Sequence, residues 1–510
     1  MKPFLLSAVV TAAGFLLCPN ALAVQFAGLF TDHMVLQRDQ PVTIWGTADP
    51  GESITVTLAA QSKTTVADPD GRWSLKFDPL KAGGEPLTLT AKSAARDQQA
   101  TVSDVLVGDV WLCSGQSNMH FQMKSVENAP QEIAGMNHPN VRFFTVKQQF
   151  GQQSLDDVEG TWQPVTPETA AACSAAACYF GTALNRQLGI PIGLVSSAVG
   201  GTRIESWMRP ETLAATGEST ELIGKWKNTT PEEFERIAKA YAAFQYQRDN
   251  AHTKAVREAR EQGKPVPPPP VQPKLRCHDC PGALHHGMIR PLEPFRFRGV
   301  IWYQGESNAG HPKSYEKLLP AMIADWRGVW GAELPFLFVQ IAPHRSIHPA
   351  FREAQHRIWK KTPHTAMVVT TDVGNMENIH PARKRPVGER LALAARATTY
   401  GEDIVSSGPV YQNMSIVGGR AVITFTHTGG GLVAKGDALS GFTIAGKDGK
   451  HVPATATIDG DTVVCIAGSV TSPVAVRYNW SMNPDGNLHN REGLPAAPFR
   501  TDPDERTTRP

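Results

Sequence analysis

The sequence predicts an α/β protein with a central parallel sheet, preceded and followed along the chain by all-β segments. Three observations lead to this prediction. Buried strand-like runs alternate with helical segments from about residue 106 to 402, as is typical of a parallel sheet. Short β-branched runs separated by turn residues fill 24–105 and recur over 403–510. A chain of 510 residues is also long enough for several domains of roughly 100–200 residues each.

Residues 1–23 have the pattern of a secretory signal peptide. Lys2 precedes the apolar run FLLSAVVTAAGFLLC, and PNALA then ends at Ala23 in an A-x-A-like cleavage site. The run is shorter than the ~20 residues that a membrane-spanning helix needs, and no other apolar run is long enough. We expect cleavage near Ala23, a periplasmic or secreted protein, and no membrane contact after cleavage.

Residues 24–105 predict an N-terminal β-sandwich. Runs such as SITVTLAA, RWSLKF and LTLTAK are separated by ADPGES and DPDGRW, which supply turn residues. Residues 403–510 predict a C-terminal β-rich module, from runs such as RAVITFTH and DTVVCIAG. GGGL at 429–432 lacks the lysine and the strand-to-helix context of a phosphate-binding loop, so it predicts a turn.

The segment 106–402 contains four strand-like runs that each end in small and polar residues: DVWLCSGQSN, GLVSSAVGG, GVIWYQGESN and AMVVTTDVG. Because ligands of open parallel sheets bind at the carboxyl ends of the strands, we expect these ends to form one site. Residues 210–275 interrupt the alternation. A capping box, TPEE at 230–233, and a proline-rich end indicate a helical insertion.

Charge and cysteine content narrow the function classes. The net charge is +2 with no dense basic run, which argues against nucleic acid as a partner.

Cys277 and Cys280 have no second ligand pair at a zinc-binding spacing, so neither a metal nor another cofactor is expected. They also do not follow a strand, as a redox CxxC motif would. We expect a disulfide that involves one or both, with a CxxC oxidoreductase as the alternative.

CSGQSNM at 113–119 contains the candidate nucleophile. Ser117 stands at the start of an expected helix, where backbone N–H groups favour developing negative charge, while Ser114 is closer to the strand. The second glycine of a G-x-S-x-G elbow is missing, which disfavours the common α/β-hydrolases. His380, in a loop after a buried strand, is the candidate base, and Glu377 and Asp372 precede it on the same loop.

Two further loops offer donors for an oxyanion. Gly200 and Gly201 have unhindered backbone N–H groups, although glycines at strand ends also serve tight turns. Gln304 and Asn308 bring side-chain amides directly after a strand.

Four blocks, GDVWLCSGQSNM, VGGTRIESW, IWYQGESNAG and IHP…VGERLA, together resemble the sialate O-acetylesterase-type carbohydrate esterases of the SGNH hydrolase superfamily. FTDHMVLQRDQPVTIWG and GLPAAPFRTD also resemble that family, so the resemblance runs from about residue 24 to 502. It implies a flavodoxin-like three-layer α/β/α core with Ser117 as nucleophile and His380 as base. The oxyanion donors would be the N–H groups of Ser117 and of Gly200 or Gly201, with Gln304 favoured over Asn308 as the amide.

The sequence departs from the superfamily in the acid that orients the histidine. An Asp is often found three residues before the histidine, where this chain has Glu377. The third member is therefore Glu377, Asp372 or a main-chain carbonyl. The histidine pair in PGALHHGMI and the 210–275 insertion also depart from the usual pattern and would reshape the substrate cleft.

The resemblance implies a carbohydrate O-acetylesterase that hydrolyses acetyl esters on sugars. O-acetylated sialic acid and plant-wall xylan or xyloglucan fragments are both candidate substrates. Arg203 and Glu306 either contact the sugar or form a structural ion pair. The alternative function is a carbohydrate-binding protein with an inactive hydrolase core.

Overall fold

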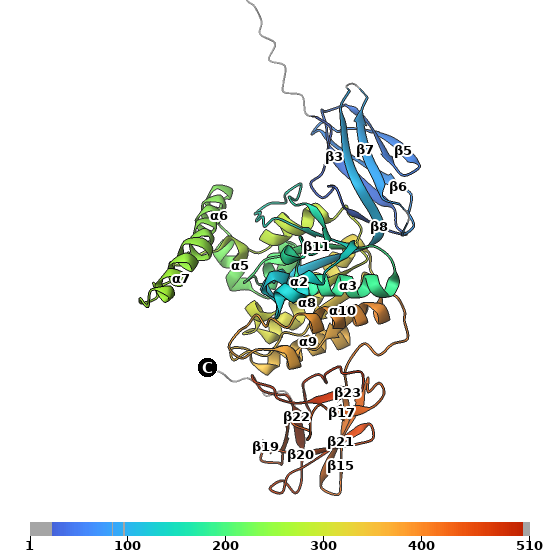
Figure 1. Ribbon diagram of the computed structural model, residues 1–510. Coiled ribbons are helices and arrows are strands. Elements are labelled where there is room, and N and C mark those ends of the chain that lie inside the picture. Colours follow the sequence, from blue (N-terminus) through green and yellow to red (C-terminus); the bar gives the residue numbers. More distant parts are fainter. Residues whose placement is uncertain (1–22, 84, 95–96, 503–510) are drawn as a thin grey trace, which may run out of the picture.

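The computed structural model describes residues 23–502 except 84, 95 and 96. The predicted signal peptide therefore lies outside the described residues, apart from Ala23. Figure 1 shows a β-rich N-terminal part, an α/β core in the middle and a β-rich C-terminal part at the opposite end. No helix in the described ranges is long and apolar enough to cross a membrane.

The N-terminal part consists of short antiparallel strands with alternating buried residues. β3 pairs with β1 and β6, and β4 pairs with β5 and β7. β8 (Gln99–Gly115) pairs with β7 and then runs on into the core, so both parts share one strand. The other strands are β1 (Gln25–Phe26), β2 (Val35–Gln37), β3 (Val42–Thr47), β4 (Ser53–Leu58), β5 (Gln61–Val66), β6 (Arg72–Phe77) and β7 (Leu87–Ser93).

The core sheet is parallel, as the sequence predicts. Its spatial order is β9 (His138–Thr145), β11 (Ile192–Ala198), β8, β12 (Gly299–Tyr303), β13 (Phe336–Val339) and β14 (Thr365–Val368). β10 (Trp162–Val165) adds an antiparallel edge beside β9. If β9 and β10 are left out and the other five strands are numbered by their order in the chain, their spatial order in the sheet is 2-1-3-4-5, as in flavodoxin-like folds. The predicted α/β fold class, with flanking antiparallel sheets, is confirmed.

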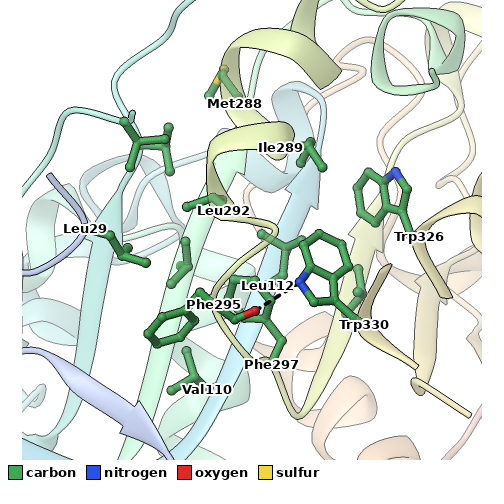
Figure 2. Packing of buried hydrophobic residues seen from close by; sticks show 14 of the residues in the cluster. Leu29, Val110, Leu112, Met288, Ile289, Leu292, Phe295, Phe297, Trp326 and Trp330 are labelled. Carbon is green, nitrogen blue, oxygen red and sulfur yellow. Dashed lines mark hydrogen bonds between the residues drawn. The ribbon is translucent and has the colours of Figure 1, made fainter. Parts of the chain in front are cut away.

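Helices cover both faces of this sheet and make three layers. Trp111 and Cys113 face α3 (Ala175–Leu188) and α10 (Arg385–Thr398), whereas Val110 and Leu112 face the opposite side, with α8 (Pro312–Trp330) and α9 (Pro349–Lys361). Figure 2 shows this second face, where the Trp330 indole N–H donates to the carbonyl oxygen of Phe295 at 3.1 Å. Apolar contact on both faces fixes the strand ends that carry the polar loops.

The insertion is helical, and α6 and α7 project from the core in Figure 1. The predicted cap is present, because Thr230 Oγ1 accepts the N–H of Glu233 at 3.2 Å. The insertion has a small apolar cluster of its own that includes Phe234, Ile237 and Tyr241. Its elements are α4 (Pro210–Ala215), α5 (Thr220–Trp226), α6 (Pro231–Tyr246), the π-helical turn η4 (Gln247–His252) and α7 (Thr253–Glu261).

The C-terminal part contains two four-stranded antiparallel sheets, β15-β16-β21-β20 and β19-β18-β22-β24, and the pair β17-β23. Together they enclose a separate apolar cluster. The strands are β15 (Val410–Val417), β16 (Arg420–Thr426), β17 (Leu432–Ala434), β18 (Phe442–Ala445), β19 (His451–Pro453), β20 (Thr455–Asp459), β21 (Thr462–Ile466), β22 (Ala475–Tyr478), β23 (Leu488–Asn490) and β24 (Phe499–Arg500).

The prediction of a disulfide that involves Cys277 or Cys280 is wrong, because the cysteines of the described chain are free and buried. Both residues pack against α6 in the cluster of the insertion, and Cys280 Sγ contacts the carbonyl oxygen of Pro281 at 3.7 Å. Burial raises the pKa of each thiol to about 12, which suppresses the reactive thiolate. The pair therefore serves packing.

Candidate active site

The loops that follow β8 and β12 meet at one point of the sheet edge. At the end of β8, Gly115 has φ +138°, and a Cβ there would lie 2.2 Å from the carbonyl oxygen of Tyr303. Only glycine allows this close approach. Gln116 then accepts the backbone N–H groups of Gly305 and Ser307 through Oε1, each at 3.3 Å. The next residue, Ser117, begins the short helix α1 (Ser117–His120).

The structure brings Ser117 and His380 together, 263 residues apart in the chain. His380 Nε2 lies 2.8 Å from Ser117 Oγ, and both side chains are partly buried. Ser114, by contrast, is fully buried, and its hydroxyl has no hydrogen-bond partner among the described residues. Only Ser117 of these two serines therefore lies beside a base.

The environment of His380 favours the neutral imidazole. Burial lowers the pKa of His380, and the charges of Lys384 and His344 lower it further. A neutral imidazole can accept the hydroxyl proton of Ser117 at neutral pH.

The glycine loop after β11 lies against the nucleophile. A Cβ placed on Gly200 would be 3.4 Å from Ser117 Cβ. In the described part of the chain, the backbone N–H groups of Ser117, Gly200 and Gly201 have no hydrogen-bond acceptor. They remain available to hold a developing oxyanion.

The two predicted amide donors do not reach this point. Gln304 is fully buried, and its Nε2 donates to Thr202 O at 3.1 Å and to Asn308 Oδ1 at 2.8 Å, so both hydrogens are used. Asn308 is 1% exposed and donates to Glu205 at 2.9 Å. Neither lines the cleft of Ser117. Their assignment as oxyanion donors is corrected: these amides hold the Gly200–Thr202 loop in place.

Neither predicted carboxylate orients His380. Glu377 is largely exposed and pairs with Arg345 at 2.7 Å. Asp372 forms a two-pronged pair with Arg390, at 2.7 and 2.6 Å. Burial raises the pKa of Asp372, but Arg390 outweighs this effect and keeps the pKa low. Among the described residues no carboxylate forms an ion pair with His380, so the expectation of Glu377 or Asp372 as third member is corrected.

A buried polar network fastens the histidine loop to α1. Asn118 donates through Nδ2 to Glu306 at 2.6 Å and to the carbonyl oxygen of Ile379 at 3.0 Å. Lys384 in turn donates to Asn118 Oδ1 at 2.6 Å. Because Ile379 directly precedes His380, this network fixes the base relative to Ser117.

Lys384 is an unusual buried cation that the sequence reading missed. Its ammonium lies 4.8 Å from the ring centre of Phe121 and 5.3 Å from that of Tyr303. Burial lowers its pKa to about 7, although Glu306 opposes this, and burial likewise raises the pKa of Glu306. One sequence signal was available: Lys384 caps the N-terminus of α10, where the helix dipole disfavours a cation.

The cleft around Ser117 and His380 has a volume of about 710 Å³. Glu306 lines it, whereas Arg203 lines an adjoining cavity of about 390 Å³. The structure therefore separates the two residues that were predicted to contact the sugar or each other. In the described ranges, no group of three or more His, Cys, Asp or Glu side chains is arranged to hold a metal ion.

Comparisons with known proteins show which proteins this chain is similar to. The family model described as "Carbohydrate esterase, sialic acid-specific acetylesterase" matches residues 107–256 and 285–397. The sialate O-acetylesterase of Mus musculus is 32% identical over 94% of this chain and 94% of its own. The human sialate O-acetylesterase is 28% identical over 94% and 92%. A solved carbohydrate acetylesterase from Xanthomonas citri is 36% identical, with a TM-score of 0.78 over 94% of this chain and 99% of its own.

Proposed function

The chain belongs to the sialic acid-specific acetylesterase family of carbohydrate esterases, and from this premise we propose that Ser117 and His380 carry out its acetylesterase reaction. The observation that carries the proposal is the 2.8 Å contact between Ser117 Oγ and His380 Nε2 at the strand ends. Such a contact between a hydroxyl and a neutral imidazole is what serine-dependent acyl transfer requires.

The reaction follows from these positions. His380 takes the hydroxyl proton as Ser117 Oγ attacks the acetyl carbonyl, and the N–H groups of Ser117 and of Gly200 or Gly201 hold the oxyanion. The ester bond then breaks, His380 protonates the leaving sugar oxygen, and Ser117 carries the acetyl group. Water attacks this acyl-enzyme with His380 again as base, and acetate leaves. Because Glu377 and Asp372 are engaged elsewhere, the reaction is assigned to a Ser–His pair held by the Asn118 network.

The substrate class is an O-acetylated sugar, and two sources are proposed: O-acetylated sialic acid and plant-wall xylan or xyloglucan fragments. The relatives are named as sialate O-acetylesterases, and the similar solved structure is named as a carbohydrate acetylesterase. We also propose export to the periplasm or the medium, on the pattern of residues 1–23. N-terminal sequencing of the mature protein should then begin at Val24.

An acetate-release screen tests the proposal. Acetylated sialic acids, acetylated xylan and acetylated xyloglucan fragments are each incubated with the protein, with Ser117→Ala as the blank. Release above the blank from at least one sugar is expected. Release by Ser117→Ala at the wild-type rate would contradict the assignment. The rival function, sugar binding by an inactive core, predicts no release from any of them.

A further inference from the structure

The cleft beside Ser117 extends well beyond the space that an acetyl group needs. Its roughly 710 Å³ lies in the range of cavities that hold whole ligands, ~300–1,000 Å³. One side carries Ser117, His380 and the glycine loop. Another part of its lining, called here the insertion wall, comes from the end of α6 and the turn η4, together with His278.

We propose that this insertion wall is a second sugar-binding subsite, in which Tyr246, His278, Gln245 and Asn250 hold a neutral sugar unit joined to the acetylated one. The proposal rests on the proposed function, because it names the part of the substrate that leads away from the ester.

Tyr246 provides a flat face for a sugar ring. Its side chain lines the cleft and is 70% exposed, which is high for an aromatic residue. Tyrosine presents an apolar ring and a polar hydroxyl with few rotatable bonds, so it suits a ligand with C–H faces and hydroxyl edges. Tyr246 also directly precedes η4, and wide π-helical turns are frequent at functional sites.

His278 provides unpaired polar atoms. It lines the cleft at 1% exposure, and neither ring nitrogen has a hydrogen-bond partner in the described structure. The nearest carboxylate oxygen, from Asp279, lies 3.6 Å from Nε2. Burial lowers the pKa of His278 to about 4, so the neutral ring has one donor and one acceptor, which a sugar hydroxyl can match. An edge contact with Tyr241, 4.7 Å between ring centres, holds the ring.

The charges of this wall favour a neutral ligand. Arg248 pairs with Asp249 at 2.6 and 3.0 Å. Arg276 pairs with Asp279 at 2.5 and 2.9 Å. Each guanidinium is thus neutralised by its own carboxylate, and His278 is uncharged. Among the described residues of the wall no unpaired cation is left to attract an anionic sugar, whereas hydroxyl groups find both donors and acceptors.

The wall is anchored firmly enough to select a ligand. The apolar face of α6 buries Phe234, Ile237 and Tyr241 against Cys277 and Cys280, the residues that flank His278. The helix that carries Tyr246 and the turn that carries His278 therefore share one apolar cluster. This packing also gives the CHDC motif a role that the redox and metal interpretations did not provide.

The test compares substrates with and without a second sugar. Acetylated xylotetraose and 4-nitrophenyl acetate are each assayed with wild type, Tyr246→Ala, His278→Phe and Gln247→Ala. Gln247 is the matched control, because it is exposed on the same helix end and does not line the cleft. Tyr246→Ala and His278→Phe should each lower kcat/KM on acetylated xylotetraose about tenfold and leave 4-nitrophenyl acetate unchanged. An equal loss of kcat/KM on both substrates, or an unchanged kcat/KM on acetylated xylotetraose, would overturn the subsite.

A binding measurement separates the subsite from the reaction. Calorimetry measures the affinity of two unacetylated sugars, xylotetraose and N-acetylneuraminic acid. Each sugar is titrated into the Ser117→Ala variant and into the double variant that combines Ser117→Ala with Tyr246→Ala. Binding of xylotetraose that weakens about tenfold in the double variant supports the subsite, even if the wild type releases no acetate and the proposed function fails. No binding of xylotetraose, or tighter binding of the anionic sugar, refutes the subsite even if the wild type is an active esterase.

Discussion

Replacing Lys384 by methionine should stabilise the fold and impair the reaction. Lys384 lies between the rings of Phe121 and Tyr303 and donates to Asn118. Methionine has a similar length, so it keeps the packing while it removes the charge and the donor.

The magnitude follows from the pKa of the buried amine. Its fall from 10.5 to about 7 corresponds to about 5 kcal/mol, at about 1.36 kcal/mol per pKa unit. Leaving Asn118 Oδ1 without its donor costs about 1–3 kcal/mol. The variant should therefore gain ~2–4 kcal/mol in free energy of unfolding at pH 6, where the wild-type amine is charged. Replacement of buried charged groups by apolar ones has effects of this size.

The gain should depend on pH. The unfolded chain keeps the lysine proton up to about pH 10.5, whereas the folded chain releases it above about 7. The unfolded state thus binds more protons between these values, so the wild type becomes more stable as the pH rises and the variant does not. Between pH 7 and pH 9 the advantage of the variant should shrink by ~2–3 kcal/mol.

Urea unfolding at pH 6, 7 and 9 measures these differences, with Lys313→Met on the exposed side of α8 as the control. The control should show no pH-dependent gain. The activity of Lys384→Met should fall about tenfold in kcat, since Asn118 loses a partner that orients it toward Ile379. A variant that is less stable than wild type at pH 6, or a difference that does not change with pH, would refute the reasoning.

Three further outcomes are expected from the site. Glu377→Gln should change kcat/KM less than about twofold, because this exposed carboxylate pairs with Arg345, and a loss of a hundredfold or more would restore it as the acid behind His380. Gly200→Ala should lower kcat/KM at least ~10-fold with an unchanged melting temperature, because the new methyl group would contact Ser117 Cβ at 3.4 Å where the acetyl group must lie. In a pH–rate profile the acid limb should lie below pH 6.5, since the base must be neutral and its pKa is lowered, and a limb above 6.5 would contradict this environment of His380.

The sequence predicted the chain segments that form the site more reliably than the partners of each side chain. Ser117, Gly200 and His380 were predicted to lie together because each follows a buried strand, and parallel strands bring their carboxyl ends to one edge of the sheet. Glu377 was expected beside His380 from its spacing in the chain. An exposed loop does not fix the direction of a side chain, and Arg345, from a different loop, binds it instead.

The missed features depend on contacts between distant segments. Gln304 follows its strand as expected, but Thr202 and Asn308 take up both of its N–H groups. Lys384 belongs to a run of charged residues that is typical of a solvated surface. Its burial results from the packing of the start of α10 against α1, which carries Asn118, and against the segment of Glu306, and its position at the N-cap of α10 does not by itself reveal that burial. The insertion was predicted to be helical and to reshape the substrate cleft, but its sequence did not show which of its side chains line the cleft.

The central claim is that Ser117, and no other serine of the CSGQSNM segment, is the nucleophile. The most direct measurement is acetate release from an acetylated sugar by wild type, Ser117→Ala and Ser114→Ala, with intact-mass detection of the acyl-enzyme. We predict that Ser117→Ala lowers turnover by about 10⁴ or more and gains no acetyl mass, while Ser114→Ala keeps most of the activity. Wild-type turnover in Ser117→Ala, or an acetyl group on a residue other than Ser117, would contradict the account.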